Sequence, residues 1–126
     1  MSAPSGFTIM TERLVLKAGD IILVAFDPAL GTEQAGTRPA IVISSDWMHG
    51  RSKRIIVCPI TRNIAPWPTK IALPASMKTK GMILTDQVRS VDERARVLRV
   101  IETADAELLW AVRRYVAQLI GFGDDD

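Results

Sequence analysis

Short apolar runs separated by turn signals dominate most of the chain. They are rich in branched residues, and Gly, Pro, Asp or charged residues bound them, which is typical of buried strands. The six runs that predict strands lie at 21–26, 40–44, 54–60, 70–73, 81–85 and 97–101. Strands at such intervals, with turns between them, indicate a small, mostly antiparallel sheet curled into a barrel or sandwich.

The last apolar pattern has a different period. Between 104 and 120 the apolar residues recur at helical spacing, with Thr103 as a candidate N-cap and Gly121 as a stop. Acidic residues near the start of this segment suit the positive end of a helix dipole. The pattern therefore predicts a mainly β (α+β) fold, an antiparallel barrel covered by a C-terminal α-helix.

The chain divides into one domain with short flanks. Its 126 residues suit a single core. We expect an N-terminal arm over 1–18, loosely ordered, the barrel domain over 19–121, and an acidic tail over 122–126. Two connections are long, at 27–37 and 61–69, and long connections in compact domains are commonly functional.

Charge is distributed unevenly along the chain. The total is only +2, but residues 38–100 hold twelve basic and four acidic side chains, a net charge of +8. The flanking stretches are rich in acid. This asymmetry favours a polyanionic partner, although any single charge is more simply explained as part of a solvated surface.

Several chemistries are excluded by counting. Cys58 is the only cysteine and His49 the only histidine, so an internal disulfide, a histidine acid–base pair and a Cys/His zinc site cannot form within one subunit. Cys58 lies in an apolar run and is expected to be a buried thiol, whereas His49 is expected at the surface. We expect no metal and no cofactor. No apolar run approaches the ~20 residues that span a bilayer, so a cytoplasmic protein without membrane contact is expected.

One stretch carries a specific motif. Gly-Asp precedes the first strand and Asp-Pro follows it, and residues 31–40 then read Gly-Thr-Glu-Gln-Ala-Gly-Thr-Arg-Pro-Ala. Later landmarks are Pro-Ile-Thr at 59–61 and Asp-Gln-Val-Arg-Ser-Val-Asp at 86–92. In this order the segments resemble the MazF/PemK (Kid) family of toxin endoribonucleases, over roughly residues 19–121.

The resemblance implies a fold, an activity and partners. It implies a homodimer of SH3-like barrels in a toxin–antitoxin module, which cleaves single-stranded RNA at selected sequences without metal. The products would carry 2′,3′-cyclic phosphate and 5′-hydroxyl ends. A cognate MazE-like antitoxin would neutralise the toxin and bind DNA together with it. Matching residue by residue, Arg38 and Thr61 correspond to the family's catalytic arginine and threonine, and Glu33 and Gln34 to the loop beside the site.

The residue types suit that chemistry. Attack of a ribose 2′-hydroxyl on phosphorus requires a proton acceptor and stabilisation of charge on the phosphoryl oxygens. Arg38 can bind two phosphate oxygens, and the Thr61 hydroxyl can donate to the phosphate or to the leaving oxygen. The base is left open between Glu33, Asp86, an arginine and water, with Glu33 favoured. The segment Leu-Thr-Asp at 84–86 lacks the arginine of the Kid-branch Arg-x-Asp motif, so the scheme of the MazF branch transfers better.

Further residues are candidates for binding RNA. Arg62 follows Thr61 and could contact a phosphate, and Arg89 belongs to the motif at 86–92. Trp67, between two prolines, could stack on an unpaired base or equally pack over the barrel end. Gln87 could read a base edge or tie down the backbone. Lys78 and Lys80 are interpreted as surface charges that aid solubility.

Two other functions compete with cleavage. A CcdB-like topoisomerase poison shares the fold and acts by binding a protein, but the Arg-Pro step at 38–39 and Thr61 argue against it. A non-catalytic RNA-binding barrel, or a degenerate toxin, would also account for the basic middle of the chain.

Overall fold

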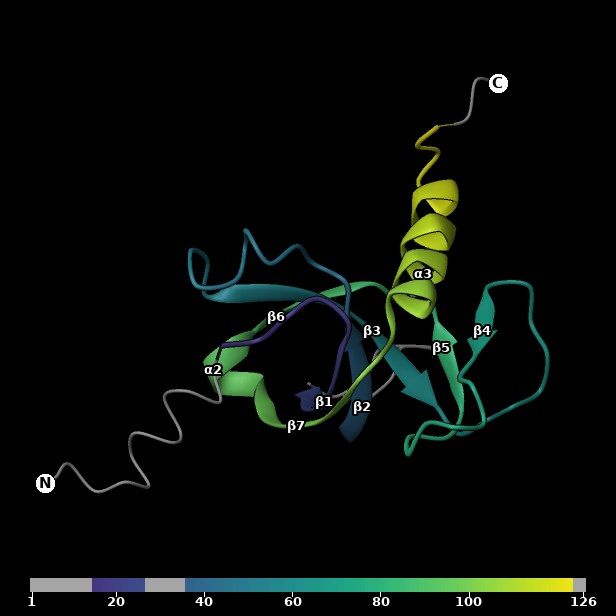
Figure 1. Cartoon of the computed structure of the whole chain (residues 1–126), viewed down its shortest axis with the longest axis horizontal. Coiled ribbons are helices and arrows are strands. Elements are labelled where there is room, and N and C mark those ends of the chain that lie inside the picture. Colours follow the sequence, from purple (N-terminus) through teal and green to yellow (C-terminus); the bar gives the residue numbers. More distant parts are fainter. Residues whose placement is uncertain (1–14, 27–35, 124–126) are drawn as a thin grey trace, which may run out of the picture.

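The computed structural model describes residues 15–26 and 36–123. Within these ranges the chain forms seven strands and two helices (Figure 1). The strands are β1 (Asp20–Phe26), β2 (Gly36–Val42), β3 (Arg54–Thr61), β4 (Lys70–Ala72), β5 (Met82–Leu84), β6 (Arg89–Asp92) and β7 (Val97–Thr103). The helices are α2 (Glu93–Arg96) and α3 (Ala106–Leu119).

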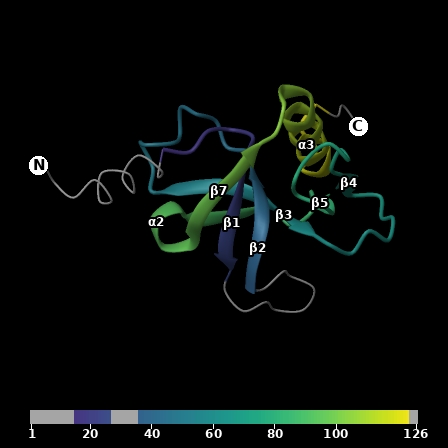
Figure 2. The ribbon, with the colours of Figure 1, turned by 60° about the horizontal axis from the view of Figure 1, so that its bottom comes forward.

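The strands form one antiparallel sheet in the order β4-β5-β3-β2-β1-β7, with β6 also paired to β3. One edge of β3 pairs with β2, and the other is shared, with β6 along Arg54–Val57 and β5 along Ile60–Thr61. Strands β7, β1 and β2 lie side by side in Figure 2. A mostly antiparallel sheet with a C-terminal helix is therefore confirmed.

The described strands leave the predicted barrel open. β7 and β4 stand at opposite ends of the strand order and are not paired with each other. The physical reason is that the outer edge of β3 is split between two short strands, and β4 has only three residues. Neither is long enough to extend the hydrogen-bonded ladder around to β7.

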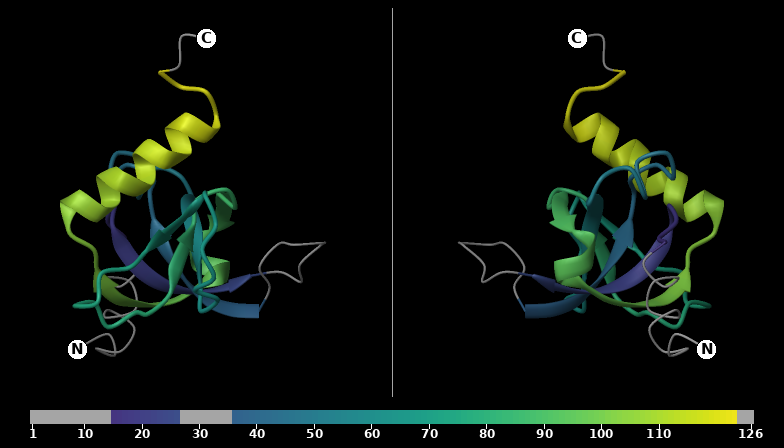
Figure 3. Two further views of the ribbon diagram at one scale, coloured as in Figure 1. Left: turned by 90° about the vertical axis from the view of Figure 1, so that its right-hand side faces the viewer. Right: turned by 90° about the vertical axis from the view of Figure 1, so that its left-hand side faces the viewer.

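Alternate residues of the strands enter two separate cores. On β2, Ala40 and Val42 pack into one cluster with Val24, Phe26, Val57 and Val91. Ile41 packs on the other face, where Leu108 and Val112 of α3 cover the sheet. Burial on both faces explains why these strands are continuously apolar. Figure 3 shows α3 lying across one side of the sheet and extending past it.

The ends of α3 correct one expectation and confirm another. The N-cap is Asp105, whose carboxylate accepts the Leu108 N–H at 2.8 Å, and not Thr103. Thr103 is instead the last residue of β7, and its hydroxyl donates to Asp20 at 2.9 Å. The stop at Gly121 is confirmed: this residue has φ +83°, and the next N–H returns to the Ala117 carbonyl at 2.8 Å.

The pattern missed β6 and α2. β6 pairs with Arg54–Val57, and its last residue, Asp92, caps α2 by accepting the N–H groups of Arg94 and Ala95 at 2.9 and 2.8 Å. Within the described ranges, neither helix is both long and apolar enough to cross a membrane.

Candidate nucleic-acid interface

Arg38 and Thr61 lie on neighbouring strands at the same end of the sheet. β2 and β3 pair in a register that sets Ala40 against Pro59. Ala40–Pro59 is the last pair of this ladder, and Arg38 of β2 and Thr61 of β3 each lie two residues beyond it, at the same end of the two strands. Arg38 is half-buried and Thr61 is buried, so both are anchored in the sheet and not in the connecting loops.

Side-chain alternation assigns these residues to one face. Val57, Val91 and Ala40 all belong to the core cluster that contains Phe26. Because every second residue of a strand faces the same side, Arg38, Thr61 and Arg89 share that face. The Thr61 hydroxyl oxygen accepts the Asn63 N–H at 3.1 Å, which leaves its proton available for donation to a ligand.

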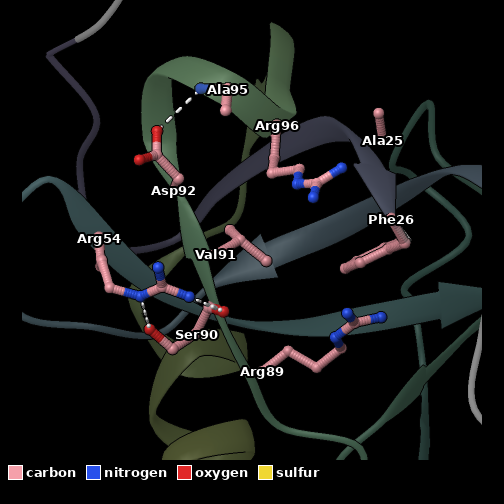
Figure 4. Close-up of a pocket in the computed structure, with 9 residues that line it drawn as sticks. All are labelled: Ala25, Phe26, Arg54, Arg89, Ser90, Val91, Asp92, Ala95 and Arg96. Carbon is pink, nitrogen blue, oxygen red and sulfur yellow. Dashed lines mark hydrogen bonds between the residues drawn. The ribbon is translucent and has the colours of Figure 1, made fainter.

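An arginine-lined pocket of about 310 Å³ opens between the end of β1, β6 and α2 (Figure 4). The Arg89 guanidinium lies over the Phe26 ring, 4.8 Å from its centroid. Arg54 and Arg96 also line the pocket, and its one acidic lining residue is Asp92. Three guanidinium groups around one concavity form a site that favours an anionic ligand.

Hydrogen bonds hold the rim of this pocket. Arg54 donates from Nε to the Ser90 hydroxyl at 2.7 Å and from Nη2 to the Ser90 carbonyl at 2.8 Å. The Ala95 N–H, with smaller contributions from the Arg94 N–H and the charge of Arg54, lowers the pKa of the Asp92 carboxyl. Asp92 therefore stays ionised as a helix cap at neutral pH. The two hydrogen bonds to Ser90 fix the guanidinium of Arg54 in position.

The other candidates are dispersed. Trp67 is exposed in the loop after β3. Gln87 is half-buried in a turn, where its backbone N–H donates to the Leu84 carbonyl at 3.2 Å. Arg62 lines a different groove on the opposite face of the sheet, beside Leu23 and Pro39. Glu33 and Gln34 lie outside the described residues.

Sequence reasoning missed three members of the arginine pocket: Phe26, Arg54 and Arg96. Phe26 carried a weak signal, since it precedes the Asp-Pro turn of the motif. Arg54 and Arg96 are separated by about forty residues of sequence and meet only because β6 pairs with β3. Because β6 was not predicted, the arginine pocket that it lines was not predicted either.

Two polar groups outside this face have structural roles. The expectation that His49 is at the surface is wrong: it is buried, with Nε2 2.6 Å from the Ser44 hydroxyl and Nδ1 2.8 Å from the Leu16 carbonyl. Its hydrogen-bonding capacity is satisfied inside a turn that the sequence pattern shows only as polar. Burial of Cys58 is confirmed, and that burial, with a smaller effect of Asp86, raises the pKa of the Cys58 thiol to about 12.

The curved antiparallel sheet, its covering helix and the arginine pocket at one end define a small β protein with a cationic site. Comparison at the family level matches residues 17–120 to the PemK-like, MazF-like toxins of type II toxin–antitoxin systems. The chain belongs to this family.

Individual relatives agree with this assignment. The endoribonuclease toxin MazF of Escherichia coli (strain K12) is 35% identical over 112 residues, which cover 89% of this chain and 100% of the relative. A crystal structure of MazF (Form-I) from Deinococcus radiodurans superposes with a TM-score of 0.80 and 34% identity, covering 86% of this chain and 98% of that one. A MazE–MazF structure (Form-II) from the same organism gives a TM-score of 0.74 at 34% identity, covering 85% and 96%.

Proposed function

We propose that the protein is the toxin of a toxin–antitoxin module and an endoribonuclease that cleaves single-stranded RNA at selected sequences without metal. The observation that carries the proposal is that Arg38 of β2 and Thr61 of β3 lie at the same end of two paired strands, on the face that also holds Arg89. Relatives named as endoribonucleases support it.

Arg38 is proposed to bind the scissile phosphate. Its guanidinium is permanently charged and can donate to two non-bridging oxygens at once. Negative charge on those oxygens grows as the 2′-oxygen approaches phosphorus, so the interaction is stronger in the transition state than in the ground state. The half-buried position on a strand keeps the guanidinium preorganised for that charge.

Thr61 is proposed to donate its hydroxyl proton in a hydrogen bond to the phosphate or to the leaving O5′ atom. The hydroxyl oxygen already accepts the Asn63 N–H, which fixes its orientation. Arg89, stacked on Phe26, is proposed to hold a neighbouring part of the RNA. Trp67, Gln87, Arg62 and Gln34 remain candidate RNA contacts.

The proposed reaction requires a base that removes the proton of the 2′-hydroxyl. The 2′-hydroxyl loses its proton to Glu33, its oxygen bonds to phosphorus, and the bond from phosphorus to O5′ breaks. O5′ then takes up a proton from water, which gives the 2′,3′-cyclic phosphate and the 5′-hydroxyl. Glu33 is our choice of base because it precedes Gly36 by three residues, and Gly36 pairs with Phe26 at the rim of the arginine pocket.

Two macromolecular partners belong to this proposal. A MazE-like antitoxin with an acidic segment would compete with RNA for the arginines around the pocket, and solved MazE–MazF complexes in this family support such a partner. A second copy of the chain would form a homodimer, for which the exposed apolar end of α3 offers a surface.

The test is cleavage of single-stranded RNA by the purified protein in EDTA, with detection of 2′,3′-cyclic ends. Arg38→Ala should reduce the rate by about a hundredfold to a thousandfold, the usual loss when a transition-state donor is removed. Arg51→Ala is the matched control, because Arg51 lies before β3 and stacks on the Trp47 ring at 4.8 Å. Its rate should remain that of the wild type.

Other outcomes would favour the alternatives. If the wild type binds RNA and makes no fragments, the protein is a non-catalytic RNA-binding toxin. If it neither binds nor cleaves RNA but inhibits a topoisomerase, the CcdB-like function is correct. Equal cleavage by the wild type and by folded Arg38→Ala would remove Arg38 from the catalytic site.

A further inference from the structure

A second cationic groove lies on the face of the sheet opposite Arg38. It has a volume of about 380 Å³, and its apolar lining residues Leu23, Pro39 and Ile101 come from three adjacent strands. Its charged lining residues are Arg62, Lys78, Lys80 and Arg99. Among the described residues that line it, none is acidic.

The loop that carries the two lysines is held by Glu102 of β7. The Glu102 carboxylate accepts the Lys78 N–H at 3.1 Å, the Thr79 N–H at 2.7 Å and the Thr79 hydroxyl at 2.6 Å. Burial acts to raise the pKa of Glu102, but these hydrogen bonds outweigh it, so the pKa is lowered and the carboxylate stays charged. The positions of the lysines are therefore built into the fold.

Lys80 closes the same loop from its other end. Its ammonium donates to the carbonyls of Ala75 and Met77 at 2.8 and 2.7 Å, and one of its three protons is left for a ligand. The interpretation of Lys78 and Lys80 as dispersed solubility charges does not account for this construction.

Two arginines of the groove are unpaired. Arg62 and Arg99 have no hydrogen-bond or ion-pair partner among the described residues, and both are exposed. Arg54 and Arg113, in contrast, donate to Ser90 and to the Ile43 carbonyl at 2.7 and 2.9 Å. Unpaired guanidinium groups beside an ordered lysine loop point to an anionic ligand with several charges.

We propose that this groove binds phosphates of single-stranded RNA that lie outside the scissile step, as an extension of the cleavage site. The inference rests on the proposed function. RNA fits better than an acidic peptide because Thr61 and Arg62 are consecutive residues at the end of β3. They face opposite sides of the sheet, so a strand that passes this end from the scissile position reaches the groove directly.

The experiment measures binding, which separates it from cleavage. The probe is a fluorescent RNA with 2′-deoxyribose at the scissile position, so that no attacking hydroxyl is present. It is made in two lengths: an extended RNA that continues beyond the cleavage site, and a minimal RNA that covers the cleavage site alone. Lys78→Gln/Arg99→Gln should weaken binding of the extended RNA by about tenfold. Its plot of log affinity against log salt should become shallower by about 1.4, because each phosphate contact on a single strand contributes about 0.7. The loss on the minimal RNA should be much smaller.

The matched control removes the same charge elsewhere. Arg51→Gln/Lys53→Gln lies at the opposite end of β3, where the two residues line another cavity, and it should leave both affinities unchanged. Glu102→Gln should weaken binding of the extended RNA, since it frees the loop while adding positive net charge. A general electrostatic effect would strengthen binding instead.

Three results would overturn the proposal. Equal losses for both double variants would indicate a nonspecific charge effect. Equal losses on extended and minimal RNA would place the two cations at the scissile step. If Lys78→Gln/Arg99→Gln weakens binding of an acidic peptide and leaves RNA binding intact, the groove belongs to the antitoxin. Absence of cleavage by the wild type on ordinary RNA would count against the proposed function alone.

Discussion

At the scale of single residues, a buried polar side chain can have a structural role and no part in the chemistry. His49 lies inside a turn and joins Leu16 to Ser44, whose hydroxyl in turn accepts the Ile56 N–H at 3.1 Å. The imidazole therefore links Leu16 to the segment that connects β2 and β3. The single histidine of the chain therefore has a structural role in the turn before β3.

Glu93 is a buried carboxyl in the first turn of α2. It is 8% exposed, and its Oε2 atom has no hydrogen-bond partner among the described residues. Burial raises the pKa of Glu93, opposed by the charges of His49 and Arg94. Because the folded state holds this proton more tightly than the unfolded state, its contribution to stability falls as pH rises above the ordinary pKa of a glutamate.

Glu93→Gln should therefore stabilise the protein at pH 7, by about 1 kcal/mol, because a neutral amide replaces a poorly solvated charge. The gain should shrink on acidification towards pH 4, where the wild-type carboxyl is protonated. Urea unfolding across this pH range measures both effects.

The neighbouring residue Asp92 is the control, because its pKa shift has the opposite direction to that of Glu93. Its pKa is lowered by the N–H groups that it caps, so Asp92→Asn should destabilise the protein at pH 7, and the loss should fade as pH falls. A destabilised Glu93→Gln at pH 7 would show that a partner satisfies Glu93 in solution.

At the scale of elements, hydrophobic runs predicted most strands well. β1 and β3 each differ from their predicted ranges by one residue, because both are apolar on two faces and end at Asp or a polar loop. β6 was missed because Arg89-Ser90-Val91-Asp92 contains one apolar residue. Its strand conformation comes from pairing with β3, a long-range interaction that no local pattern encodes.

The candidate site shows the same difference between local features, which the sequence predicts, and long-range ones, which it does not. The predicted strands at 40–44 and 54–60 stopped just short of Arg38 and Thr61, so both residues could be expected near the ends of consecutive strands. The arginine pocket and the cationic groove could not, because each gathers residues from three or more elements. That the sheet stays open could not be predicted either, since apolar runs give strand number but not edge pairing.

Gly81, just before β5, allows the end of β3 to approach closely. Its φ is +127°, and a Cβ there would lie 2.2 Å from the Thr61 carbonyl oxygen. Gly81→Ala should therefore cost about 2 to 4 kcal/mol of unfolding free energy. It should also reduce RNA cleavage per folded molecule, because Thr61 must move.

Gly50→Ala is the control for Gly81→Ala, because it measures the cost of the positive φ without a steric clash. Gly50 has φ +86°, and a Cβ there would meet no atom within 4 Å. Its loss should stay near 1 kcal/mol, with cleavage unchanged. Equal effects of the two substitutions, in chemical unfolding and in cleavage, would show that the contact with Thr61 is relaxed in solution.

At the scale of the whole molecule, two features of the surface bear on partners: cationic concavities and an exposed apolar patch. The net charge of +2 conceals two cationic concavities, one on each face of the sheet. Several exposed apolar side chains lie along α3 and its end, which extends past the sheet in Figure 3. Trp110, Leu119, Ile120 and Phe122 are all exposed there, and the last two are each 76% exposed.

A surface of this kind on a small toxin suits a second copy of the chain. Two cavities of about 470 and 400 Å³ flank it, one beside Trp110 and Phe122 and one beside Leu119 and Ile120. We therefore expect the wild type to sediment as a dimer. Ile120→Glu/Phe122→Glu should convert it to a monomer, because burial of each side chain contributes about 1.5 to 3 kcal/mol, which together correspond to at least a hundredfold in Kd.

The control is Ile64→Glu, since Ile64 is also exposed, at 70%, but lies in the loop after β3. It should leave the dimer intact in the same sedimentation velocity experiment. Unfolding free energies extrapolated to low protein concentration should be similar for both variants, because neither position belongs to a core cluster. If the double variant stays dimeric, the end of α3 is not the contact between subunits. If Ile64→Glu also dissociates the dimer, the contact extends to the face that carries Thr61, and each active site would then border the partner subunit.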